Sequence, residues 1–194
     1  MLLLGLQNEV LSMVFTEIYS RFMEIIFAPV RNTEMMWILV PVIASLLLME
    51  LYFKRYADEG LGWDTAFGNS LVLIFVSIDL FRFLHGSGML EYVALENALV
   101  IAVALLGLML TLTSFFHILP KQMVFGFSSR LPVNVIACLA VIIIYSGISI
   151  DVYTAIVSVI FTVLVWLLLK AFDMLIPESG EIPELENIES EEEK

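Results

Sequence analysis

Residues 62–86 read GWDTAFGNSLVLIFVSIDLFRFLHG, and this stretch indicates the solvent in which the protein folds. After Asn69 it runs through nine uncharged residues, SLVLIFVSI, before Asp79 and Arg82 appear three positions apart. A helix needs about 20 predominantly apolar residues to cross the hydrocarbon core of a bilayer. The length and composition of the stretch are therefore typical of a membrane-spanning helix.

Charged residues flank this run on both sides. We expect Asp64 to be the N-cap, because its carboxylate can accept a hydrogen bond from a free amide at the helix start, and Asn69 to open the apolar span. Asp79 and Arg82 lie one turn apart and can neutralise each other, which matters because an isolated charge in hydrocarbon is costly. The favoured interpretation is an interfacial ion pair that ends the span, and the alternative is a buried functional site.

Four further runs of this kind occur in the chain. Its 194 residues are 60% hydrophobic and 15% charged, whereas about a quarter of the residues in a soluble domain are charged. We expect spans at residues 35–53, 68–84, 97–119, 133–148 and 152–176. The predicted fold is all-α, a polytopic bundle with five transmembrane helices that occupies residues 31–176.

The N-terminal segment, residues 1–30, has a different pattern. Polar side chains recur every four residues at Asn8, Ser12, Thr16, Ser20 and Glu24, accompanied by Glu9, Glu17 and Arg21, and Pro29 is expected to stop the run. This is typical of an amphipathic helix. Surface-bound helices usually present a basic face to anionic lipid, and this one is acidic. We expect it to lie at the membrane interface, packed on its own bundle or on a neighbouring subunit; the alternative is a sixth span.

The distribution of positive charge predicts the orientation. Loops and helix ends on one side of the predicted bundle contain Lys54, Arg55, Lys121, Arg130 and Lys170, and the other side contains Arg21, Arg31 and Arg82. Because basic residues favour the cytoplasm, the C-terminus of this integral membrane protein is expected there. The tail, residues 177–194, has eight glutamates and one lysine. We expect it to be disordered; it could attract a basic cytosolic partner, and it disfavours nucleic-acid binding.

A weak internal duplication relates residues 34–84 to residues 96–148. GWDTAFGN before the second span resembles GFSSRLPVN before the fourth, and each ends in an asparagine, Asn69 or Asn134. Parallel repeats occur in transporters, whose substrate sites lie between the halves. Asn69 and Asn134 are therefore candidate transport positions, with a structural hydrogen bond as the alternative role.

Residues that could support catalysis or metal binding are sparse. The middle of every predicted span lacks charge, and Glu50, near the end of the first, is expected to pair with Lys54 four residues on. Cys138 is the only cysteine, and His85 and His117 are expected at opposite ends of the bundle. Nucleotide-binding and hydrolase motifs are absent from the sequence. No catalytic, metal-ligating or cofactor-binding residues are assigned, and an enzyme is not expected.

The favoured function is therefore a non-catalytic subunit, or an assembly or scaffold component, of a membrane complex. Its expected partners are membrane lipid together with a second copy or other membrane subunits. The alternative is a small-solute or ion transporter or channel. The polar positions that transport or packing would use are Asn69, Asn134, Glu50, Asp79 and Arg82.

Overall fold

All regular structure is helical in the part of the chain that the computed structural model describes, namely residues 2–55, 62–89 and 94–175. The elements follow in the order α1 (Leu2–Arg31), the 3-10 helix η1 (Thr33–Met35), α2 (Met36–Arg55), α3 (Trp63–Gly86), α4 (Ala94–Phe115), α5 (Lys121–Phe127), α6 (Arg130–Ser146) and α7 (Val152–Leu175). The acidic tail that the sequence predicts to be disordered lies outside the described residues.

Five segments are long and apolar enough to cross a bilayer. They are η1 with α2, then α3, α4, α5 with α6, and α7. Helix α1 is not among them, so the predicted five-span bundle with an additional N-terminal helix is confirmed, and α1 is not a sixth span. By helix length and hydropathy, the chain is a multi-pass integral membrane protein.

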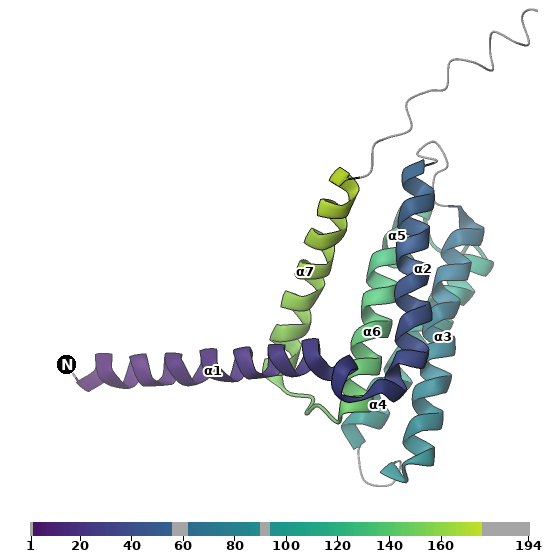
Figure 1. Ribbon diagram of the computed structural model, residues 1–194. Helices are drawn as coiled ribbons and strands as arrows, with labels where there is room; N and C mark the ends of the chain where they lie inside the picture. The colour runs from purple at the N-terminus through teal and green to yellow at the C-terminus, as the bar shows by residue number, and fades with distance from the viewer. Residues whose placement is uncertain (1, 56–61, 90–93, 176–194) are drawn as a thin grey trace, which may run out of the picture.

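Helix α6 lies at the centre of the bundle and contacts α1, α2, α3, α4 and α7 (Figure 1). Two thirds of its span, 67%, is buried, compared with 17% for the span formed by α7. Ala137 and Ala140 are buried on α6. Helices in lipid gain little from burying leucines against each other, so small side chains that allow close approach favour this central position.

Helices α3 and α4 share the most extensive helix–helix contact in the described part of the chain. Gly107 of α4 lies directly against Leu73 and Ile74 of α3, and a Cβ atom at Gly107 would come within 2.9 Å of the Leu73 Cβ. The Ser70 and Thr111 hydroxyls, 3.0 Å apart, are hydrogen-bonded across the same contact. Gly107 and Thr111 are small residues four positions apart on α4, and small side chains on one face favour helix packing in a membrane.

Helices α1 and α7 stand apart from the unit formed by α2, α3, α4 and α6. Figure 1 shows α1, in purple, lying across the axis of the bundle, with its N-terminal half extending away from it. Helix α7, in yellow-green, contacts α6 and the C-terminal part of α1 and lies on the side of α6 away from α3 and α4.

Several predicted boundaries are wrong by up to two turns. Helix α3 begins at Trp63 with Gly62 as its N-cap, so Asp64 lies inside the first turn and Asn69 lies within the helix rather than at its start. Helix α1 continues through Pro29 to Arg31. At the start of α3 the helix extends beyond the apolar run that marks the hydrocarbon core. At the end of α4 the reverse holds, because the predicted span continues to residue 119 whereas the helix ends at Phe115.

Replacing Gly107 by alanine is expected to destabilise the bundle. The added methyl group must displace Leu73 or the α3 backbone, and such overpacking costs about 1 to 3 kcal/mol. The matched control is Gly68→Ala on α3, where an added Cβ has no atom within 4 Å. Thermal unfolding in detergent should show a lower midpoint for G107A alone; equal midpoints for both variants would contradict this packing.

Candidate functional site

Helix α1 has two parts that differ in their surroundings. In the anchored segment, residues 18–28, Ile25 and Ala28 are buried, and Ile18 and Phe22 pack against the core. In the arm, residues 2–17, Leu11 and Phe15 are 54% and 64% exposed. Where its side chains are described, at residues 9–17, the arm is therefore a largely exposed continuation of a docked helix.

One apolar row runs through both parts of α1. Leu11, Phe15, Ile18, Phe22 and Ile25 follow one another at spacings of four and three residues, so they lie on a single face of the helix. The bundle covers this face from Ile18 onward. We call the row of five residues the α1 seam; its first two members have no tertiary cover in the described part of the chain.

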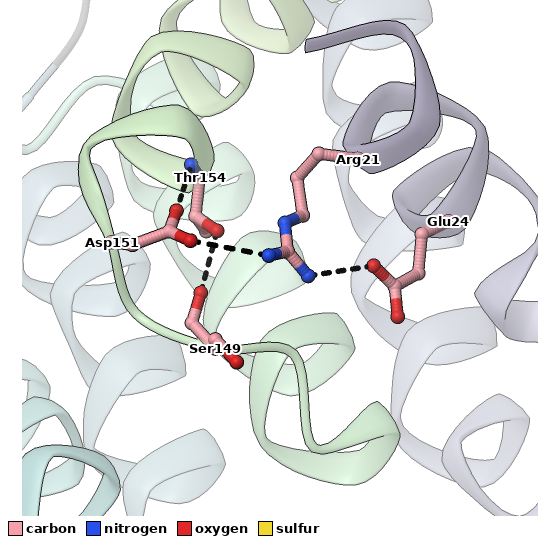
Figure 2. A network of polar contacts seen from close by, with 5 residues as sticks. All are labelled: Arg21, Glu24, Ser149, Asp151 and Thr154. Carbon is pink, nitrogen blue, oxygen red and sulfur yellow. Dashed lines mark hydrogen bonds and ion pairs between the residues drawn. The ribbon is translucent and has the colours of Figure 1, made fainter. Parts of the chain in front are cut away.

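An ion pair fixes the anchored segment to the start of α7. The Arg21 guanidinium donates to Glu24 Oε2 at 2.8 Å and to Asp151 Oδ2 at 3.1 Å. Figure 2 shows Arg21 between these two carboxylates, with Glu24 on α1 and Asp151 just before α7. Because Arg21 is largely covered by its surroundings, the contact sets the direction in which the arm leaves the bundle.

Asp151 also organises the first turn of α7. Its Oδ1 accepts a hydrogen bond from the Thr154 backbone amide at 2.8 Å, and the Thr154 hydroxyl donates to the Ser149 carbonyl at 2.6 Å (Figure 2). These bonds make Asp151 the N-cap of α7. The backbone hydrogen bond from Thr154, helped by the Arg21 charge, lowers the pKa of the Asp151 carboxyl below its ordinary value.

A second polar contact joins the end of α1 to α6. The Asn32 side-chain amide donates to the Tyr145 carbonyl at 2.9 Å, and Asn32 Oδ1 accepts from the Glu34 amide at 3.2 Å. One asparagine therefore caps η1 and holds the α1–η1 corner against the end of α6.

The predicted pair of Asp79 and Arg82 forms at the same end of the bundle. Arg82 Nη2 lies 2.7 Å from Asp79 Oδ1, and the Tyr145 hydroxyl donates to Asp79 Oδ2 at 2.7 Å. The Tyr145 ring stacks on Phe83, with 3.9 Å between centroids. Through Tyr145, the pair thus ties α3 to α6 near the helix ends, and the choice between an interfacial and a functional role stays a prediction.

At the opposite end, Glu50 has a partner that the sequence did not suggest. Its carboxylate lies 3.3 Å from the Arg130 guanidinium, which also donates to the Met49 carbonyl at 2.8 Å. The predicted partner Lys54 has its side chain outside the described part. The contact joins α2 to α6, and sequence spacing within one helix could not reveal it.

Asn69 and Asn134 both donate to main-chain carbonyls. Asn69 bonds the Ser128 carbonyl at 3.0 Å, and Asn134 bonds the Arg130 carbonyl, one turn earlier in α6, at 2.7 Å. Both side chains are buried. These bonds fit the structural role considered from the sequence, and the transport role of the two residues stays a prediction.

The histidine, cysteine and acidic side chains of the described residues form no metal-binding cluster. Among the described residues, no group of three or more histidine, cysteine or acidic side chains could hold a metal ion. His117 stacks edge-on against Trp63 at the start of α3, with 4.1 Å between ring centroids, whereas His85 lies at the opposite end of that helix. This separation agrees with the expected placement of the two histidines.

The role of Asp151 was not predicted from the sequence. It lies 130 positions from Arg21, in a loop between two apolar runs, so no local pattern relates the two residues. One signal was available: Arg21 is the only base in the polar stripe of residues 8–24, and such a base needs an acidic partner when its helix is partly buried.

Comparison of the chain with family models, with curated proteins and with solved structures finds no match. The contacts described above are therefore the basis for the functional conclusion.

Removing the Asp151 charge is expected to loosen the α1–α7 junction. Asp151→Asn keeps an oxygen that can cap α7 but loses the ion pair with Arg21, and Asp151→Ala loses both. Hydrogen exchange at residues 18–28, measured on the full chain in lipid nanodiscs, should become faster from wild type to D151N to D151A. Glu24→Gln is the control, because its partner Arg21 is on the same helix.

Lowering the pH is also expected to loosen the α1–α7 junction. A carboxyl whose pKa is lowered by folding stabilises the folded state above its ordinary pKa, and this contribution is lost as the pH falls through the lowered value. For Asp151, with an ordinary pKa of 3.8, protection of residues 18–28 should fall below pH 3.8, and D151N should show less of this loss. Identical acid profiles for wild type and D151N would contradict the assignment.

Proposed function

We propose that the protein is a non-catalytic subunit, or an assembly factor, of a membrane complex, and that the arm of α1 binds a neighbouring subunit of that complex. The observation that supports this proposal is the α1 seam, which the bundle covers at Ile18, Phe22 and Ile25 and leaves open at Leu11 and Phe15.

The exposed apolar face of the arm, described at residues 9–17, needs a partner. Isolated helices of about 15 residues are marginal in water, and helices in proteins owe most of their stability to the packing of an apolar face. A membrane surface alone is an imperfect partner, because interfacial helices usually have a basic polar face. The described polar face of the arm contains Glu9 and Glu17 and has no lysine or arginine before Arg21, which is engaged by Glu24 and Asp151.

The negative charges of Glu9 and Glu17 also indicate the type of partner. Two copies of the arm packed seam to seam would bring like-charged glutamates together, which is unfavourable. A different membrane-embedded subunit, with an apolar helix face flanked by lysine or arginine, complements both the seam and the acidic edge. Direct pairing of two copies and simple burial in lipid are the competing outcomes.

The arrangement of charged groups also supports a scaffold over a transporter. Near the helix ends, Asp79 pairs with Arg82 within α3 and bonds Tyr145 of α6, and Glu50 pairs with Arg130 between α2 and α6, so each of these groups has a partner within the bundle. Transporters of ions and protons usually place ionisable residues deep within their spans. A transport function that uses Asn69 and Asn134 remains the alternative prediction, and flux into vesicles would test it.

Disrupting the open part of the seam should release the partner. In the double variant Leu11→Ser/Phe15→Ser, two side chains lose burial worth about 1.5 to 3 kcal/mol each, so binding should weaken by at least about 100-fold. The control Ser12→Ala/Thr16→Ala changes the polar stripe next to the seam and should bind as wild type does. Native mass spectrometry of complexes extracted in mild detergent measures the loss.

A photo-crosslinker at position 15 identifies what the arm contacts. The proposal expects a crosslink to one integral membrane protein that also co-purifies in fixed stoichiometry and is lost in the seam variant. A crosslink to a second copy, or to lipid alone, would overturn it. Deleting residues 2–16 leaves the anchored segment in place and should also release the partner.

For the orientation, we propose that the end of the bundle with Arg130 and Lys170 faces the cytoplasm, because basic residues favour that side. A cysteine introduced at position 192 in a Cys138→Ser background should react with an impermeant maleimide only after cells are permeabilised. Reaction in intact cells would reverse the orientation. A basic cytosolic partner for the acidic tail, which lies outside the described residues, stays a prediction.

A further inference from the structure

Helices α2, α6 and α7 enclose a lateral groove that is independent of the α1 arm. Its cavity of about 290 Å³ has walls formed by α2 and α7, and side chains of α6 line it between them. Ile43 and Leu168, on opposite walls, are 42% and 61% exposed, so the groove opens sideways toward the lipid. Asn134 of α6 is buried and its amide donates to the Arg130 carbonyl, so the surface that the groove presents is apolar.

The length of the groove matches the thickness of one leaflet. Its lining runs over residues 39–47 of α2 and residues 134–142 of α6, each of which is about 12 Å of helix. One leaflet contributes about half of the roughly 30 Å hydrocarbon core. Ile25 and Pro29 of α1 line the end that lies away from the start of α6. The groove therefore has the dimensions of a site for an acyl chain that enters from the other end.

A charged hollow of about 210 Å³ adjoins that other end, and Leu169 lines both spaces. Arg130 and Lys170 bring two positive charges to the hollow, and Glu50, paired with Arg130 at 3.3 Å, brings one negative charge. Lys170 is exposed and has no acidic partner among the described side chains. Its Nζ atom lies 4.8 Å from the centroid of the Trp166 ring, and tryptophan is typical of the membrane interface. The hollow thus keeps one positive charge in excess, next to the mouth of an apolar groove.

We propose that the groove and the hollow together bind one anionic phospholipid, with an acyl chain in the groove and the phosphate beside Lys170. Basic pockets between transmembrane helices are typical sites for anionic lipid headgroups. A headgroup with a net negative charge neutralises the excess charge of the hollow. Phosphatidylcholine brings its own positive charge and gains less there, and a free phosphate ion has no chain to fill the groove.

The test compares two phospholipid probes that differ only in the headgroup. The full-length protein is reconstituted in vesicles of dioleoyl phosphatidylcholine that contain a trace of phosphatidylglycerol or of phosphatidylcholine, each with a diazirine in one acyl chain. After illumination, mass spectrometry maps the adducts. The phosphatidylglycerol probe should label groove residues about 5-fold more than the phosphatidylcholine probe, which is the effect of one lysine on an anionic lipid.

Three variants assign the preference to this site. Lys170→Gln should abolish it while labelling by the phosphatidylcholine probe persists, which reports that the groove is intact. The matched control Lys121→Gln removes a positive charge at the same end of the bundle, outside the lining of the groove and the hollow, and should keep the preference. Ile43→Trp, on the α2 wall, should reduce labelling by both probes.

Three results would overturn the proposal. The first is equal labelling by both probes in the wild type. The second is an equal loss of preference in K121Q and K170Q, since that would indicate attraction to the surface charge of the protein as a whole. The third is labelling that I43W leaves unchanged.

Discussion

The absence of water in the hydrocarbon core is the constraint on which the rest of this structure depends. Every backbone amide and carbonyl in that region needs an internal partner, which leaves the helix as the solution for each apolar run. Charged side chains are consequently confined to the ends of the spans, where two of the ion pairs also join elements. Arg21 and Asp151 join α1 to α7, and Glu50 and Arg130 join α2 to α6. The same ion pairs that neutralise charge therefore define the arrangement of the bundle.

Helix α6 shows how this constraint selects a central element. It combines a nearly uninterrupted apolar sequence with Ala137 and Ala140, and its neighbours approach it on several sides. Its polar side chains lie near its ends: Asn134 close to the first turn and Tyr145 in the last. Tyr145 contacts Asp79 through its hydroxyl and Asn32 through its carbonyl, so the end of one helix organises two neighbouring elements.

Local properties of the sequence were sufficient to predict the spans, because each span reflects the composition of about 20 consecutive residues. They also predicted the pair of Asp79 and Arg82, since three positions on a helix bring side chains together. They could not predict that Glu50 binds Arg130, because 80 positions separate the two residues and Lys54 offered a suitable spacing nearby. Likewise, the polar stripe of α1 was visible in the sequence. The division of α1 into an anchored segment and an arm, however, depends on where α6 ends and α7 begins. The burial of the Asn134 Oδ1 atom without a hydrogen-bond donor among the described residues is also a property of the assembled helices.

The junction in Figure 2 has a mechanical consequence. Helix α1 crosses the end of α7 and is bound to it through Arg21 and Asp151, and Asp151 is also the cap from which α7 starts. Helix α7 has few other contacts with the bundle. A force applied to the arm of α1 by a bound partner would therefore reach the first turn of α7 through this ion pair and the cap that Asp151 provides.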